Sequence, residues 1–298
     1  MSQFIGLLIS GLMLGAIYGL IAMGFVIVFK ATNVVNFAHA SIVMLGAYLV
    51  AKWHHSLGFF GAIAVAAAVC AVAAALLDIV IVRPLRRRGG STDALAIMTI
   101  ALNIIIGTEL VRAVGNDLLP SGAPWGSDVT SIIGAAIPKA RIAAAVVAIA
   151  VMGVFFLVFK RSDWGVAMRS AASDPEAAAL MGIRLGRVAA GAWAVAGALA
   201  AIGGAFFVSF PAGGVSNVTG LLALSAIPVA VLGGLDSIAG ALVGGLLIGA
   251  AQTLAAGYQD ELSFLGRGLS NVVPYIVLFV VLLWRPWGLF GTRELTRV

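Results

Sequence analysis

The chain has 298 residues, of which 62% are hydrophobic and only 10% are charged. Soluble domains carry roughly 25% charged residues, so this composition excludes an ordinary soluble enzyme and a disordered chain. Cys70 is the only cysteine, which excludes a disulfide scaffold and a thiol metal site. The net charge of +6 comes from basic residues scattered between apolar segments, so we do not expect nucleic-acid binding. The composition indicates an integral membrane protein.

Apolar stretches long enough to cross a membrane recur along the whole chain, since a spanning helix needs about 20 mostly apolar residues. They cover residues 4–29, 31–51, 59–82, 94–114, 142–159, 188–235, 237–259 and 268–284. The stretch 188–235 is too long for one helix, and its Pro211-Ala-Gly-Gly predicts a break near residue 211. We expect the first span to be retained, because it lacks a basic leader and a cleavage site. The prediction is one all-α transmembrane domain over residues 1–298 with about eight spans.

Two of these stretches have the character of broken or re-entrant helices, near residues 33–40 and 219–237. The first carries several polar side chains, and the second is short and ends in Gly233-Gly234-Leu235-Asp236-Ser237. Such backbone is tolerated at membrane depth only where it is buried in protein or lines a cavity. The residues predicted to line a solute path are Asn33, Asn36, His39, Ser41, Gly233, Gly234, Asp236 and Ser237. The alternative is that these groups only satisfy the broken backbone.

Orientation follows from the distribution of basic residues between the connections. Thirteen of the eighteen Lys and Arg residues fall in one set of connections, which we assign to the cytoplasm; the other five are Lys52, Arg112, Lys139, Arg141 and Arg267. The N-terminus is then outside and the C-terminus cytoplasmic. The basic run Arg83-Pro-Leu-Arg-Arg-Arg88 is expected to anchor this topology and to attract anionic membrane lipid.

The longest cytoplasmic connection, 160–187, contains a short predicted helix. Asp174 suits the N-cap, Pro175 the first helical position, Glu176 the first turn and Gly182 the end. Glu176-Ala177-Ala178, followed after three residues by Gly182, resembles the EAA-x3-G coupling motif of ABC-importer membrane subunits.

Three further motifs narrow this resemblance. The segment from Asn33 to Tyr48, NVVNFAHASIVMLGAY, is similar to a signature of the permeases of branched-chain amino-acid ABC importers. Val231 to Gly245 and Arg285-Pro-Trp-Gly-Leu-Phe-Gly291 resemble two later segments of the same family, in the same order. The chain departs from the family at Ala40 and Asp236, where glycine is frequent.

The resemblance implies the transmembrane subunit of an importer of the shorter type, in a bacterial inner membrane. Its implied partners are a second permease, two cytoplasmic ATPases and a periplasmic binding protein. The coupling residues carried over are Asp174, Pro175, Glu176, Ala177, Ala178 and Gly182. No P-loop pattern is present, so ATP and Mg are expected on the ATPases, with no cofactor, metal or catalysis on this chain. The connections 115–138 and 257–268 are candidates for docking the binding protein.

Several alternatives stay open from the residues alone. A permease for urea, amides or sugars would share the fold, and an ion-coupled transporter would need Asp78, Glu109 or Asp236 as an ion site. An intramembrane hydrolase is disfavoured because His39 and Ser41 are two residues apart and would face differently on a helix.

Two remaining patterns predict structural roles. Glu109 and Arg112 are three residues apart and are expected to pair on one helix. Glycines recur at every fourth position, as in Gly11-Gly15-Gly19 and Gly245-Gly249, which lets helix backbones approach closely in lipid. We expect these glycines to pack within the chain, with a subunit interface as the alternative.

Overall fold

The structure is a computed structural model that describes residues 2–125, 128–132, 135–209, 213–261 and 268–292. It is almost entirely helical, and six of the helices in these ranges are long and apolar enough to cross a membrane. Two shorter apolar helical segments, Thr219–Gly233 and Leu269–Trp284, accompany them. The chain is therefore an all-α, multi-pass membrane protein, as the composition predicts.

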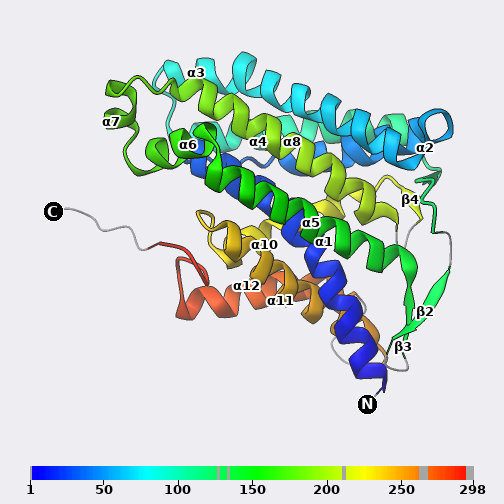
Figure 1. The fold of residues 1–298 in the computed structure, drawn as a ribbon. Helices are drawn as coiled ribbons and strands as arrows, with labels where there is room; N and C mark the ends of the chain where they lie inside the picture. Colours follow the sequence, from blue (N-terminus) through cyan, green and yellow to red (C-terminus); the bar gives the residue numbers. More distant parts are fainter. Residues whose placement is uncertain (1, 126–127, 133–134, 210–212, 262–267, 293–298) are drawn as a thin grey trace. The chain divides into compact units, whose positions relative to one another are not determined.

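The chain divides into two compact units, whose helices and strands carry the labels of Figure 1. Unit 1 comprises Met1–Val26, Trp125–Ile149 and Leu224–Val298, and unit 2 comprises Ile27–Pro124 and Ala150–Ala223. Two helices contribute residues to both units, α1 (Ser2–Thr32) and α5 (Lys139–Arg161). Unit 1 also contains β2 (Val129–Ile132), β3 (Ala135–Pro138), α10 (Ala226–Gly233), α11 (Ile238–Gly257) and α12 (Leu269–Trp284).

Unit 2 contains the remaining elements. They are α2 (His39–Leu77), η1 (Asp78–Val82), α3 (Arg83–Arg87), α4 (Thr92–Val114), β1 (Leu119–Pro120), α6 (Asp163–Ser173), α7 (Pro175–Leu180), α8 (Leu185–Ser209), β4 (Gly214–Val215) and α9 (Thr219–Ala223).

The predicted boundary at residue 31 is wrong, because α1 continues to Thr32 and the next helix begins only at His39. The two predicted spans that follow form one helix, α2, with a kink where Gly58 adopts a φ of 69°. The break predicted near residue 211 falls on residues 210–212, outside the described residues.

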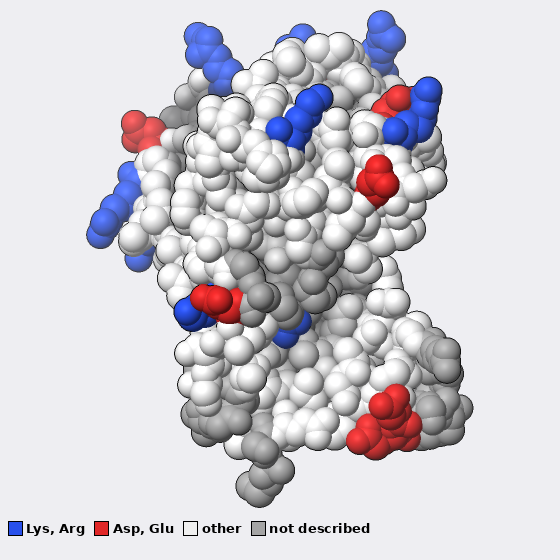
Figure 2. All heavy atoms as spheres, turned by 90° about the vertical axis from the view of Figure 1, so that its right-hand side faces the viewer, with Lys and Arg blue, Asp and Glu red and all other residues white. Residues whose placement is uncertain are grey.

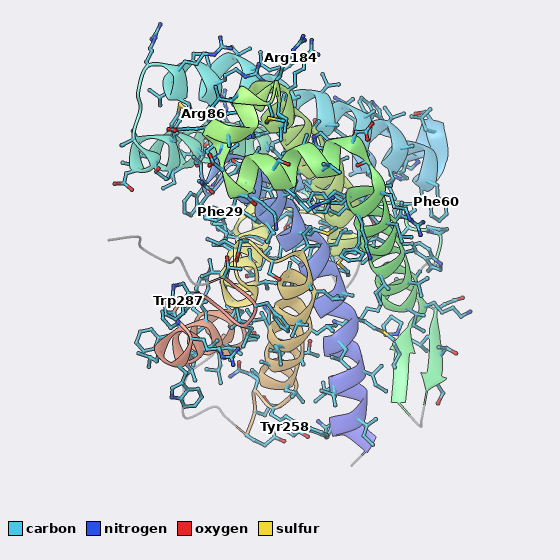
Figure 3. The ribbon with its side chains drawn as sticks, turned by 60° about the vertical axis from the view of Figure 1, so that its left-hand side comes forward. Phe29, Phe60, Arg86, Arg184, Tyr258 and Trp287 are labelled. Carbon is cyan, nitrogen blue, oxygen red and sulfur yellow. The ribbon has the colours of Figure 1, made fainter. Side chains whose placement is uncertain are left out.

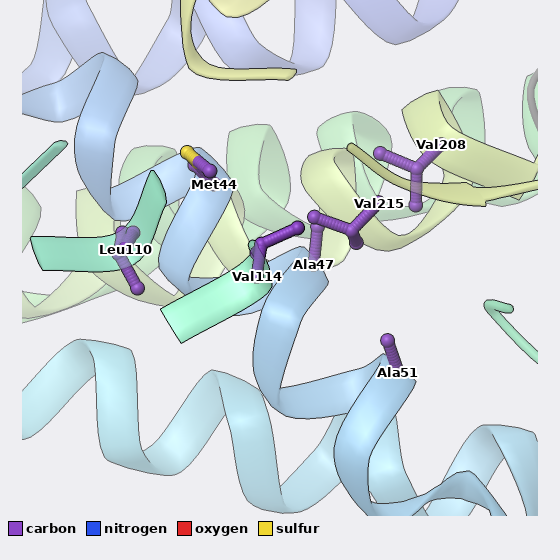
Figure 4. Close-up of a cluster of buried hydrophobic side chains, with 7 residues drawn as sticks. All are labelled: Met44, Ala47, Ala51, Leu110, Val114, Val208 and Val215. Carbon is purple, nitrogen blue, oxygen red and sulfur yellow. The ribbon is translucent and has the colours of Figure 1, made fainter. Parts of the chain in front are cut away.

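In unit 2, α2 packs closely along α8 through small residues. A side chain at Gly46 would overlap Ala201, and one at Gly204 would overlap the backbone of Val43. The same unit has an apolar cluster contributed by α2, α4, α8 and β4 (Figure 4), formed by Met44, Ala47, Ala51, Leu110, Val114, Val208 and Val215. Close backbone contact and interlocking aliphatic side chains hold these helices together where lipid supplies no hydrophobic driving force.

In unit 1, the glycine stripe of α1 packs on the glycine stripe of α11. A Cβ atom at Gly15 would lie 2.5 Å from the carbonyl oxygen of Gly245, and one at Gly11 would lie 2.7 Å from the Cα atom of Ala250. These contacts confirm that the stripes serve helix packing within the chain. The first half of α1 is thereby tied to α11 at backbone distance.

Large apolar side chains face outward on the long helices. Val72 on α2 is 60% exposed, and Ile97 on α4 and Phe279 on α12 are each 66% exposed. Figure 2 shows few charged side chains on an otherwise uncharged surface. Exposed apolar faces of this extent are unfavourable in water and suit contact with lipid.

Candidate functional site

The first helix interruption lies between α1 and α2, in unit 2. Asn33 has a φ of 53°, in the left-handed region that asparagine tolerates better than most residues, and its N–H donates to the carbonyl of Phe29 over 2.7 Å. Residues 34–36 have no regular secondary structure, and helix resumes at His39. The predicted interruption at 33–40 is therefore present, and it spans six residues from Asn33 to Ala38.

Side chains of α4 supply the hydrogen bonds that this interrupted backbone lacks. The N–H of Phe37 donates to Thr99 Oγ1 over 3.2 Å, and the same hydroxyl lies 3.1 Å from the carbonyl oxygen of Val35. The N–H of Ser41 donates to Asn103 Oδ1 over 3.1 Å. Sequence reasoning missed Thr99 and Asn103; the available signal was their spacing of four, which places both on one face of a predicted span.

The four polar residues predicted here have different surroundings. Asn33 is exposed, His39 is fully buried, and the Ser41 hydroxyl donates to the carbonyl of Ala38 over 2.8 Å. Asn36 is 1% exposed, and neither oxygen nor nitrogen of its side-chain amide has a hydrogen-bond partner among the described residues. Because buried polar groups are normally hydrogen-bonded, this amide is the strongest candidate in the segment for contact with a bound molecule.

The second interruption, between α10 and α11 in unit 1, is held by main-chain groups. Gly233 and Gly240 meet backbone to backbone, so that a side chain on either would overlap the other. The C-terminal segment then pairs with the end of α10: the N–H groups of Leu289 and Phe290 donate to the carbonyls of Leu232 and Gly233 over 2.8 and 3.0 Å. Two motifs that are far apart in the sequence thus form one structure.

The polar residues of this second interruption have partners. Asp236 accepts hydrogen bonds from the N–H of Thr292, over 3.0 Å, and from its hydroxyl. The Ser237 hydroxyl caps α11 by accepting from the N–H of Gly240 over 3.0 Å. Gly234 has a φ of 101°, and a side chain there would overlap Gly291. Their assignment to a solute path stays a prediction.

Unit 1 also contains a cluster of polar side chains that was not anticipated from the sequence. The Tyr18 hydroxyl of α1 is hydrogen-bonded to the side chains of Ser225 and Gln252. The oxygen of the Gln252 amide is buried and has no hydrogen-bond partner among the described residues. The three residues lie in stretches predicted to be apolar spans. They are far apart in the sequence, and only the fold brings them together.

The short helix predicted in the connection 160–187 is present as α7, and its coupling role stays a prediction. The Asp174 carboxylate accepts from the N–H groups of Glu176 and Ala177 over 3.0 and 2.9 Å, which makes it the N-cap, and Pro175 follows at the first position. Gly182 has a φ of 86°, and the N–H of Ile183 closes the helix on the carbonyl of Ala178 over 3.0 Å. This is the Schellman arrangement, which favours glycine at the left-handed position.

The end of α7 carries exposed apolar side chains. Leu180 is 89% exposed and Met181 is 84% exposed, whereas Ala178 is buried. Both large side chains lie in the polar connection 160–187, between the spans, where lipid contact does not explain them. An exposed apolar tip on a helix with defined ends is typical of a protein-docking element.

Charged residues in unit 2 form structural pairs. Asp78, which is 0% exposed, accepts from Arg83 over 2.9 Å and from Arg86 over 3.0 Å. Glu109 and Arg112 pair at 2.9 Å on the exposed surface of α4, as predicted from their spacing. Within the described ranges, no group of three His, Cys, Asp or Glu side chains could hold a metal ion.

The connection 115–138 contains strands rather than helix. β1 pairs with β4 in unit 2, with Leu119 opposite Val215, and β2 pairs with β3 in unit 1, with Val129 opposite Pro138. Residues 126–127 and 133–134 of this connection lie outside the described residues, as do residues 262–267 of the 257–268 connection. Docking of a binding protein on these connections stays a prediction.

Comparisons with known proteins agree with the motifs. A family model described as the branched-chain amino acid transport system permease component matches residues 7–282. The chain is 31% identical, over 308 residues, to the high-affinity branched-chain amino acid transport system permease protein BraD of Pseudomonas aeruginosa. That alignment covers 98% of this chain and 97% of the relative.

Two further relatives extend the comparison. The Escherichia coli K12 permease protein LivH, with the same description, is 30% identical over 99% of this chain and 98% of its own length. A probable branched-chain amino acid transport permease of Methanocaldococcus jannaschii is 27% identical over 91% of this chain and 88% of its own length. No solved structure matches the chain. The chain belongs to the family of branched-chain amino acid transport system permease components.

Proposed function

We propose that this chain is the transmembrane subunit of an ATP-driven ABC importer that carries branched-chain or other hydrophobic amino acids. The observation that carries the proposal is α7: a helix capped by Asp174, ended by Gly182, and tipped by the exposed Leu180 and Met181. The names of BraD and LivH, which describe branched-chain amino acid transport, support the choice of solute.

In this proposal α7 inserts into a groove on a cytoplasmic ATPase. Two such ATPases hold ATP and Mg, a second permease completes the path, and a periplasmic binding protein delivers the solute. This chain is not catalytic and binds no cofactor. It lies in a bacterial inner membrane with its N-terminus outside and its C-terminus in the cytoplasm, as the distribution of basic residues favours.

The solute path includes the interruption between α1 and α2. An amino acid is a zwitterion, so its ammonium and carboxylate groups need both acceptors and donors inside the membrane. The Asn36 amide offers one acceptor and two donors, and among the described residues it has no hydrogen-bond partner. We therefore assign solute contact to Asn36 first, and the other predicted path residues remain proposals.

The test of this function is association with the ATPases. The tagged chain is extracted from its native membrane, and the proteins that co-purify are identified by mass spectrometry. We expect two ATPase copies and a second permease. Leu180→Glu with Met181→Glu should reduce the recovered ATPase at least about tenfold, because two charges would enter an apolar contact, while Asp174 and Gly182 still hold the helix.

Leu118→Glu is the matched control, since Leu118 is 52% exposed and lies in the connection assigned to the other face. This variant should retain the ATPases. Normal ATPase recovery with the double variant would contradict the docking role of α7. A homodimer without ATPase that takes up solute under an ion gradient would replace the proposal with an ion-coupled transporter.

A further inference from the structure

A pocket of about 400 Å³ lies in unit 2, where α1, α3, α6, α7 and α8 approach one another. Its walls bring together basic side chains of α1 and α3, small or apolar residues of α6, α7 and α8, and Thr32 and Asn33 at the end of α1. The basic residues are Lys30 of α1 and Arg83, Arg86 and Arg87 of α3, and the other walls include Pro175 of α7 and Gly186 of α8. Arg86 is labelled in Figure 3, toward the same end of the unit as Arg184.

The pocket carries a net positive charge. Among the described residues that line it, none is acidic. Asp78 lies behind the wall, fully buried, and its carboxylate is shared by Arg83 and Arg86. Both arginines are nevertheless 20–30% exposed in their side chains. One buried carboxylate is thus shared by two arginines, and Arg87 adds a third guanidinium, so these arginines keep a net positive charge and the pocket favours an anion.

Arg83 is held in a defined position in the wall of the pocket, where it can bind an anion. Its guanidinium donates to Asp78 over 2.9 Å and to the carbonyl of Gly186 over 2.5 Å. A Cβ atom at Gly186 would lie 3.3 Å from the guanidinium carbon, so the small residue permits this approach. Both bonds use Nη2, and the buried Nε–H has no hydrogen-bond partner among the described residues, so this guanidinium keeps donor capacity of the kind that phosphate oxygens accept.

We propose that this pocket binds a phosphate group, supplied by the headgroup of an anionic phospholipid. Lys30 and Arg83 each follow directly on a long apolar stretch, so the pocket lies at the level where spans leave the membrane and lipid headgroups gather. Pro175 in the wall places the ligand beside α7. The inference goes beyond the proposed transport function, because binding is a property of this chain alone.

The adjacent residues Arg87 and Arg88 offer a matched pair of variants. Both belong to the same basic run and both are exposed, but only Arg87 lines the pocket. Neither makes an ion pair within the described part of the chain. If lipid were attracted diffusely to the basic run, neutralising either residue would weaken lipid binding equally. If lipid binds in the pocket, neutralising Arg87 weakens binding more than neutralising Arg88.

The experiment is calorimetric titration of the purified full-length chain in detergent. Short-chain phosphatidylglycerol is the probe, and inorganic phosphate is titrated separately to identify a soluble source. We expect saturable binding of the lipid at one site per chain, weakened about fivefold or more by Arg87→Gln and less than about twofold by Arg88→Gln. Elution as a single species on size exclusion confirms that each variant is folded.

The possible outcomes distinguish a lipid headgroup from free inorganic phosphate as the source of the bound phosphate group. Lipid binding that depends on Arg87 supports the proposal, and Arg87→Lys, which keeps the charge but loses the guanidinium, should bind with intermediate affinity. Saturable binding of inorganic phosphate without binding of the lipid would overturn the lipid source. Equal losses with Arg87→Gln and Arg88→Gln, or no saturable binding of either probe, would overturn the pocket as a phosphate site.

Discussion

The interruption after α1 and the interruption after α10 both leave backbone groups without helical partners, but different groups satisfy them. After α1, side chains of α4 provide the hydrogen bonds, through Thr99 and Asn103. After α10, the main chain of the C-terminal segment provides them, through Leu289 and Phe290. The first arrangement leaves the Asn36 amide buried and without a hydrogen-bond partner among the described residues. The two interruptions therefore differ in what is left over: the first keeps an amide without a hydrogen-bond partner among the described residues, whereas the polar side chains Asp236 and Ser237 of the second have partners.

The largest effect is expected at the glycine contact of the second interruption. Gly233→Ala would place a methyl group into the backbone of Gly240, and no flexible side chain is there to move. We expect a loss of about 3 kcal/mol or more of stability, at the upper end of the usual cost of overpacking because only backbone atoms could move, seen as a lower melting temperature in detergent.

Gly107→Ala is the control for that substitution. Gly107 lies on α4, and a Cβ atom added there would meet no heavy atom within 4 Å. Its melting temperature should stay unchanged. Equal stability of the two variants would mean that α10 and α11 do not meet at backbone distance, and the structural role of the second interruption would be lost.

A smaller effect is expected at the first interruption. Thr99→Val keeps the shape of the side chain but removes the hydroxyl oxygen that accepts from the N–H of Phe37. Leaving this N–H unsatisfied should cost about 1–2 kcal/mol, again measured as the melting temperature. Thr108→Val, at an exposed position of the same helix, should have no measurable effect. If Thr99→Val is as stable as the unsubstituted chain, the backbone there is satisfied by other means.

Much of the helical architecture could be predicted from apolar runs, because lipid requires long apolar helices whatever their neighbours. The predicted span 94–114 compares with Thr92–Val114 in the structure, and 237–259 compares with Ile238–Gly257. The ends of α7 were also predictable, since Asp174 and Gly182 act through bonds to nearby residues in the sequence.

Features that depend on tertiary contact could not be predicted in the same way. The pairing of the C-terminal segment with α10 joins residues more than fifty positions apart, such as Leu232 and Leu289. The Tyr18 cluster and the basic pocket each gather residues from three or more elements. No local pattern marks these residues as neighbours, because each is compatible with an ordinary span or an ordinary surface.

The most direct test of this account is the effect of Asn36→Leu on transport and on stability, measured together. Removing an amide that has no hydrogen-bond partner in the described structure should leave the melting temperature nearly unchanged or raise it. Uptake of radiolabelled leucine by the reconstituted transporter should fall about tenfold or more, the effect of one lost hydrogen bond of ~1.4 kcal/mol to a charged group. Undiminished uptake with Asn36→Leu would contradict the assignment of the first interruption to the solute path.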